Sequence, residues 1–65
     1  MKTIEELKAT YYYETLYDEI EARIEEIRKA KGWRTVNEKR YNEAMNEIAK
    51  EWDTDADALK EYYEE

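Results

Sequence analysis

The chain has 65 residues, of which 45% are charged, and its formal net charge is −7. A chain this short forms one domain at most, residues 1–65, and buries only about 60% of its unfolded surface. It has no cysteine, histidine or serine, which excludes disulfides, imidazole metal sites and Ser-His or Cys-His catalysis. We therefore expect no enzymatic activity, no cofactor and no small-molecule substrate.

The longest apolar pattern predicts one straight helix from Thr3 to Lys31. Its apolar side chains fall on a single stripe: Tyr13, Leu16, Tyr17, Ile20, Ile24 and Ile27. Gly32 is the only glycine, and it stands where a helix commonly ends in a left-handed residue, with Trp33 able to pack back on the last turn. The alternative is that the chain bends or restarts near Thr10 and folds residues 3–10 over the core. Because no Gly or Pro marks a break there, we expect the helix to be continuous.

Two further helices are predicted, from about 36 to 52 and from about 55 to 63. Their apolar stripes are Tyr41, Ala44, Met45, Ile48, Ala49 and Trp52 in the first, and Ala56, Leu59, Tyr62 and Tyr63 in the second. Each predicted helix begins at a T-x-x-[E/D] capping box; the three boxes are Thr3 with Glu6, Thr35 with Glu38, and Thr54 with Asp57. The predicted fold class is an all-α three-helix bundle with a long first helix.

Residues 47–63 resemble a helix-turn-helix module of DNA-binding proteins. The small, aliphatic and aromatic positions of that pattern are matched by Ala49, Leu59, and Tyr62 or Tyr63. The resemblance implies a tight turn between the last two helices. The chain departs from the pattern in two ways. Asp53 stands where the turn of such a module has a glycine, and the helix in the position of the recognition helix carries five carboxylates and a single cation, Lys60. Phosphate contacts supply most of the non-specific affinity for DNA, so we expect nucleic-acid binding by this helix to be disfavoured.

An acidic run near the C-terminus has the spacing of some calcium-loop ligands. Asp53, Asp55, Asp57 and Glu64 match four ligand positions of an EF-hand loop. The glycine that the sharp turn of such a loop requires is replaced by Ala58. We therefore interpret these carboxylates as helix caps and solvated charges, and we predict no metal site.

A second apolar stripe near the N-terminus predicts a surface for a partner. On a straight helix Ile4, Leu7 and Tyr11 lie roughly opposite the stripe that begins at Tyr13. Tyrosine is favoured at binding surfaces because it offers a large contact area with few rotatable bonds. The predicted partner-binding residues, for self-association or another protein, are Ile4, Leu7, Tyr11 and Tyr12. The alternative is that these tyrosines fill the edge of a thin core.

The charges of the chain are segregated along the sequence. Residues 28–40 have a net charge of +5, whereas residues 1–27 have −5 and residues 41–65 have −7. One interpretation is that the cations complement the helix dipole and pair with neighbouring helices. The other is an anion site at the turn between the first two predicted helices, with these candidate residues: Arg28, Lys31, Arg34, Lys39 and Arg40.

Composition leaves three hypotheses for function. The restricted alphabet resembles that of a de novo designed helical mini-protein and also fits a small natural protein from an AT-rich genome. The leading hypothesis is a structural or protein-interaction module that uses the N-terminal Tyr/Ile/Leu surface. The others are an acidic inhibitor or antitoxin-like protein that mimics nucleic acid, and a nucleic-acid binder that uses the basic turn 28–40. No apolar run is long enough to span a bilayer, so we expect no membrane association and, for a natural protein, a cytoplasmic location.

Overall fold

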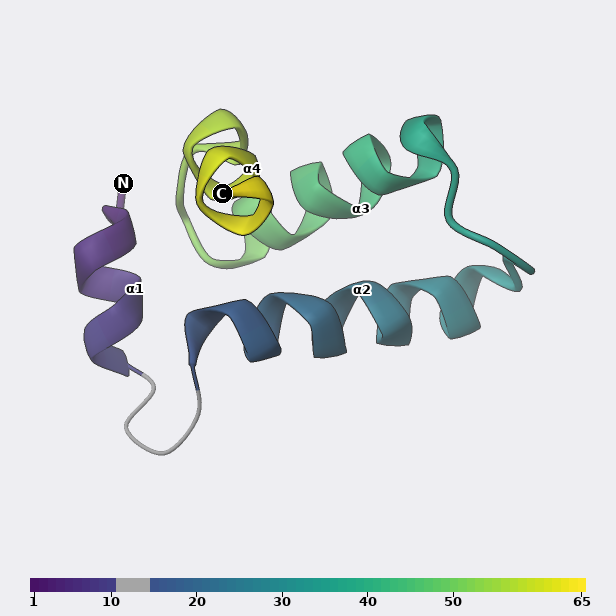
Figure 1. The fold of residues 1–65 in the computed structure, drawn as a ribbon, viewed down its shortest axis with the longest axis horizontal. Coiled ribbons are helices and arrows are strands. Elements are labelled where there is room, and N and C mark those ends of the chain that lie inside the picture. Colours follow the sequence, from purple (N-terminus) through teal and green to yellow (C-terminus); the bar gives the residue numbers. More distant parts are fainter. Residues whose placement is uncertain (11–14) are drawn as a thin grey trace.

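The computed structural model describes residues 1–10 and 15–65 (Figure 1). These residues contain four helices, α1 (Ile4–Thr10), α2 (Leu16–Lys31), α3 (Glu38–Glu51) and α4 (Ala56–Glu64). Helices α2 and α3 run antiparallel beside each other, and α4 packs on both of them, while α1 stands against α4 at one end of the molecule. Within the two described stretches, no helix is long and apolar enough to cross a membrane.

The prediction of one straight helix from Thr3 to Lys31 is wrong. Helix α1 ends at Thr10, and α2 begins after Thr15, whose hydroxyl oxygen accepts a hydrogen bond from the amide of Asp18 at 3.1 Å. The all-α class is confirmed, with four helices in the described residues instead of three. Because the two helices have different directions, both can direct their apolar faces towards one core. The two apolar stripes therefore do not face opposite sides, as they would on one straight helix.

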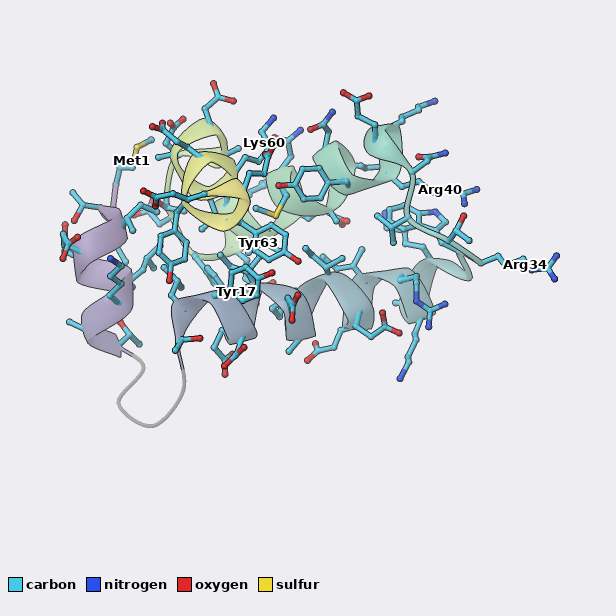
Figure 2. All side chains as sticks on the ribbon, in the orientation of Figure 1. Met1, Tyr17, Arg34, Arg40, Lys60 and Tyr63 are labelled. Atoms are coloured by element: carbon cyan, nitrogen blue, oxygen red, sulfur yellow. The ribbon has the colours of Figure 1, made fainter. Side chains whose placement is uncertain are left out.

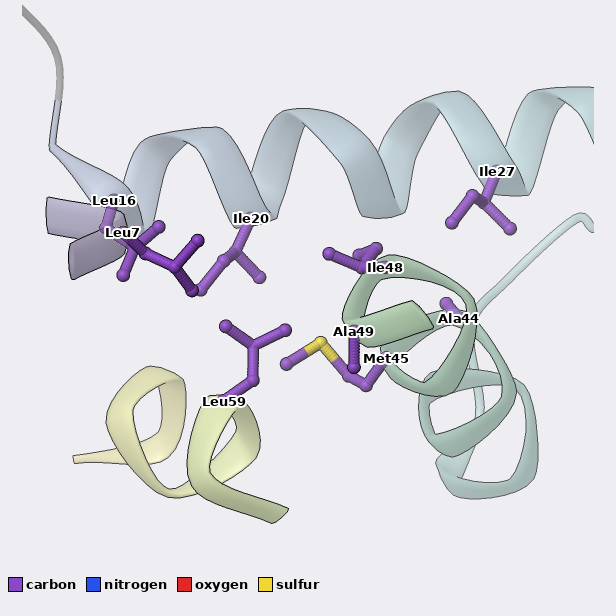
Figure 3. Packing of buried hydrophobic residues seen from close by; sticks show 9 residues of the cluster. All are labelled: Leu7, Leu16, Ile20, Ile27, Ala44, Met45, Ile48, Ala49 and Leu59. Atoms are coloured by element: carbon purple, nitrogen blue, oxygen red, sulfur yellow. The ribbon is translucent and has the colours of Figure 1, made fainter. Parts of the chain in front are cut away.

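One apolar core joins all four helices (Figure 3). Its buried members are Leu7, Leu16, Ile20, Ile27, Ala44, Met45, Ile48, Ala49 and Leu59. The Leu7 side chain is only 3% exposed, and Figure 3 shows it beside Leu16. Burying an aliphatic side chain of this size stabilises a fold by about 1.5–3 kcal/mol, so α1 contributes directly to the core. The stripe predicted in the opening helix is only partly internal, because Tyr17 remains 42% exposed.

The predicted end of the first long helix is confirmed. Gly32 has a φ of 72°, and the amide of Trp33 donates a hydrogen bond of 2.9 Å to the carbonyl oxygen of Arg28. This is the glycine-dependent helix end that the sequence predicts. Helix α3 ends in the same left-handed conformation, but there the residue is Asp53, with a φ of 54°.

One of the three predicted capping boxes is confirmed. The amide of Glu6 donates to the hydroxyl oxygen of Thr3 at 3.2 Å, and the Thr3 amide donates back to the Glu6 carboxylate at 3.1 Å. The other two boxes are wrong, because α3 begins after Asn37 and α4 begins after Asp55. Each of these caps accepts the amide three positions on, at 2.9 and 3.1 Å, which leaves Thr54 available for a different contact.

The N-terminal residues tie α1 to the turn between α3 and α4. The Lys2 amide donates to the carbonyl oxygen of Asp53 at 2.6 Å, and the Thr54 hydroxyl donates to the Lys2 carbonyl oxygen at 2.7 Å. The amino group of Met1 lies 3.7 Å from the Asp53 carboxylate. We call residues 1–3 the N-terminal strap, because these bonds hold the start of the chain against a turn near its end.

Candidate functional site

Two adjoining hollows run along α2, where it faces α3 and α4. Their volumes are about 710 and 510 Å³, and they adjoin at Ile24 and Tyr63, which line both. Val36 and Tyr41 complete the apolar lining of the larger hollow. We call this surface, together with the neighbouring Tyr17, the tyrosine groove. Figure 2 shows Tyr17 and Tyr63 lying together between α2 and α4.

Three tyrosines from three helices stack in series at the groove. The ring centroids of Tyr17 and Tyr63 are 4.8 Å apart with an interplanar angle of 22°, and those of Tyr41 and Tyr63 are 6.1 Å apart at 29°. Stacked aromatic pairs stabilise by about 0.5–1.5 kcal/mol beyond simple burial. The stack therefore ties α4 to both long helices, and Tyr17, at its end, is 42% exposed.

Two of the phenol groups hold carboxylates beside the stack. The Tyr63 hydroxyl donates to Glu21 at 3.3 Å, and the Tyr41 hydroxyl donates to Glu64 at 3.0 Å. Burial, followed by the nearby Glu21 carboxylate, raises the pKa of Tyr63 to about 12. Burial and the hydrogen bond to Glu64 raise the pKa of Tyr41 well above its ordinary value. Both phenols therefore stay neutral and keep donating at any pH near neutrality.

The lining of the groove is predominantly acidic. Its ionisable lining residues, apart from the tyrosines, are one cation, Lys60, and five carboxylates: Asp18, Glu21, Glu25, Glu38 and Glu64. Lys60 donates to Asn42 at 3.2 Å and lies 3.7 Å from the carboxylate of Asp57. A hydrogen bond of 3.0 Å from the Arg28 guanidinium lowers the pKa of Glu25. In the described residues, the other four carboxylates of the groove have no cation paired with them.

Three of the five predicted anion-site residues have partners within the chain, and two of these hold the α2–α3 loop. Arg28 and Arg40 each donate to a loop carbonyl oxygen, at 2.9 and 3.0 Å, and the Lys31 ammonium lies 3.6 Å from a carboxylate of α3. Arg34 extends from the far end of the molecule into solvent (Figure 2). Neither its side chain nor that of Lys39 makes a hydrogen bond or ion pair with the described part of the chain. Two of the five candidate cations therefore order that loop, and Lys31 links α2 to α3.

The predicted N-terminal partner surface is placed differently by the structure. Leu7 is buried in the core, and Ile4 is half-buried against it, so these two side chains do not form an outward apolar stripe. Tyr11 and Tyr12 lie outside the described residues. The surface depended on a straight first helix, and that premise is wrong because α1 and α2 are separate helices.

Sequence reasoning did not predict the tyrosine groove. It assigned Tyr17, Tyr41 and Tyr63 to the inward stripes of three different helices. One signal was present, since each stripe carries a tyrosine whose hydroxyl needs water or a polar partner when the ring is buried. This requirement predicts that each tyrosine lies at the border of a helix contact, but it does not predict that the three tyrosines contact one another.

The acidic run near the C-terminus is used for local structure. Asp55 caps α4, and Asp53 forms the left-handed turn before it. In the described part of the chain, no group of three or more His, Cys, Asp or Glu side chains could hold a metal ion. No protein-family model, curated protein or solved structure matches this chain, so geometry and charge alone guide the functional inference.

Proposed function

We propose that this chain is a non-catalytic protein-interaction module whose tyrosine groove binds a positively charged segment of another protein. The observation that carries the proposal is the lining of the groove, which combines stacked aromatic rings with five carboxylates and one cation. Aromatic residues are enriched at protein interfaces, and a surface of one charge sign steers and selects partners of the opposite sign. A net charge of −7 extends this attraction over the whole molecule.

This proposal moves the interaction surface away from the N-terminus. The buried Leu7 cannot contact a partner without leaving the core, whereas Tyr17 is already 42% exposed. A positively charged partner is also what the hypothesis of an acidic nucleic-acid mimic requires, because such a mimic binds the basic cleft of a nucleic-acid-binding protein. Nucleic-acid binding through the basic turn has weaker support, since three of its five candidate cations are engaged inside the chain.

The test is a binding titration with two labelled peptides of equal length, one of alternating Arg and Ala and one of alternating Glu and Ala. We expect fluorescence anisotropy to rise with the basic peptide only, and the affinity to fall as salt is added, because salt screens exposed charges. Absence of binding to the basic peptide at low ionic strength would overturn the proposal. A gel shift with duplex DNA that Arg34→Glu abolishes would favour the nucleic-acid hypothesis instead.

A further inference from the structure

Building on the function proposed above, we propose that the tyrosine groove is specific for arginine: the guanidinium group of a partner protein stacks on the Tyr17 ring and pairs with the carboxylate of Glu21. This assignment names the chemical group that the groove recognises and the two residues that recognise it.

The Tyr17 ring offers a surface on which a planar cation can lie. Tyr63 stacks on it at 4.8 Å, yet 42% of Tyr17 remains exposed. Among the described residues, Met1 is the only other large hydrophobic residue with comparable exposure. A guanidinium group is planar, weakly hydrated and well suited to stacking on an aromatic ring, whereas the ammonium of lysine is a compact and strongly hydrated charge.

Glu21 supplies the negative charge at the right position. It lies four residues after Tyr17 on α2, and residues with this spacing are neighbours on the same face of a helix. One carboxylate oxygen accepts the hydrogen bond from Tyr63, which holds the side chain beside the stack. No cation of the described residues pairs with Glu21, so its charge remains available to a guanidinium, which donates two parallel hydrogen bonds to a carboxylate.

Several carboxylates of α2 and α3, including Glu25 of the groove, already have cations. Glu25 accepts from Arg28, Glu26 and Glu51 both accept from Arg23, and Glu47 lies 3.6 Å from Lys31. The groove carboxylates Asp18, Glu21, Glu38 and Glu64 lack such partners in the described part of the chain. Exposed carboxylates elsewhere in the described residues, such as Glu43 and Glu61, also lack cations. What distinguishes the four groove carboxylates is that they line hollows that the stacked ring of Tyr63 also lines, so negative charge and an aromatic surface occur together, as a cationic occupant requires.

A second copy of this chain is a weaker occupant than a basic partner. Its exposed Arg34 could reach a groove, but two copies that each carry a net charge of −7 repel one another at long range. A partner with net positive charge is instead attracted by the negative charge of this chain. We therefore assign the site to an arginine of a different, basic protein.

The experiment compares one peptide in two forms, a flexible Gly-Ala peptide with two arginines and the same peptide with two lysines. Binding is measured with wild type, Tyr17→Leu and Glu21→Gln. Glu43→Gln is the matched control, because it removes one exposed carboxylate of α3 that does not line the groove. We expect wild type to favour the arginine peptide by about two- to fivefold, the factor that an exposed cation–π contact contributes.

The variants locate the site. Glu21→Gln keeps an oxygen that can accept from Tyr63, so the stack and the fold should persist, as helical circular dichroism will check. We expect Glu21→Gln and Tyr17→Leu each to weaken the arginine peptide by more than Glu43→Gln does and to abolish the preference over lysine. If Tyr17→Leu fails to fold, the Glu21→Gln and Glu43→Gln pair decides the result.

Three outcomes would overturn the assignment. If Glu21→Gln and Glu43→Gln weaken binding of the arginine peptide equally and binding still depends on salt, the arginine site is wrong but the proposed function stands. Failure of both peptides to bind wild type would remove the proposed function as well. A concentration-dependent rise in mass of the protein alone, reversed by Arg34→Ala and competing with the peptide, would show that a second copy occupies the groove.

Discussion

The hydroxyl of Thr54 donates a hydrogen bond of 2.7 Å to the carbonyl oxygen of Lys2, a residue 52 positions earlier in the chain. Thr54 is the only buried polar side chain among the described residues, with 8% of its surface exposed. Helix α1 has seven residues, which is too short for stability without tertiary contacts. The bond between Thr54 and Lys2 is therefore one of the contacts that keep α1 folded against α4.

The first prediction concerns this bond. Thr54→Val keeps the shape of the side chain but leaves the carbonyl oxygen of Lys2 without its donor. We expect a loss of about 1 kcal/mol in the free energy of unfolding, measured by urea denaturation, because a part-buried hydrogen bond is removed. Thr35→Val is the control, since the hydroxyl of exposed Thr35 makes no hydrogen bond with the described residues. Equal stability of the two variants would contradict a stabilising role for the strap.

The second prediction concerns Leu7. Because its side chain is 3% exposed in the core, Leu7→Ala should cost about 2–4 kcal/mol of unfolding free energy in urea. Ile4→Ala serves as a comparison and should cost less, since Ile4 is only half-buried. If Leu7→Ala instead left stability unchanged and lowered the mass of an oligomer in sedimentation equilibrium, Leu7 would belong to an intermolecular contact.

The sequence predicted which faces of the helices are apolar better than it predicted where the first helix ends. The pattern T-x-x-[E/D] that marks Thr3 also occurs at Thr15 and Asp18, where α2 begins. The prediction of a continuous helix rests instead on the absence of Gly and Pro between Thr3 and Lys31. Periodicity reports which side chains share a face of one helix, and it cannot reveal that a helix has stopped and that a second one has turned to a new direction.

The two helix ends show a similar contrast. Gly32 could be predicted as a left-handed residue because glycine takes a positive φ at no steric cost. Asp53 adopts a positive φ although it is not a glycine. Two backbone hydrogen bonds hold this turn in place, one from the Lys2 amide to the Asp53 carbonyl oxygen and one from the Thr54 amide to the Ala49 carbonyl oxygen. The groove was beyond sequence reasoning for the same reason, since its Tyr63–Glu21 contact joins residues 42 positions apart.

The third prediction uses this pair of turns. Asp53→Gly should stabilise the fold by about 0.5–1 kcal/mol, because glycine relieves the strain of a positive φ at 54°. Gly32→Ala should destabilise it by about 1 kcal/mol, since a Cβ at φ 72° is strained even though open space surrounds it. Thermal or urea unfolding of both variants gives the test. A loss of stability in Asp53→Gly would mean that the exposed pair between its carboxylate and Met1 outweighs the relief of strain.

The fourth prediction concerns alkaline pH. Burial and the Glu21 carboxylate raise the pKa of Tyr63 from 10.0 to about 12 in the folded protein. Below pH 10 both the folded and the unfolded chain hold this proton, and the stabilisation is fully present. Between pH 10 and about 12 the unfolded chain releases the proton first, so the free energy of unfolding should fall as pH rises. A stability profile from urea denaturation, with near-ultraviolet phenolate absorbance, measures both quantities.

The control for this prediction is Tyr63→Phe, which keeps the ring of the stack and removes the titrating group. Every other titrating group is common to both proteins, so the difference between the two stability profiles isolates the Tyr63 hydroxyl. We expect the fall in stability above pH 10 to be shallower in Tyr63→Phe, and the phenolate titration to lose a late component. Parallel profiles would mean that the Tyr63 hydroxyl is as accessible to solvent in the folded protein as in the unfolded chain, and the hydrogen bond that positions Glu21 in the groove would then be absent.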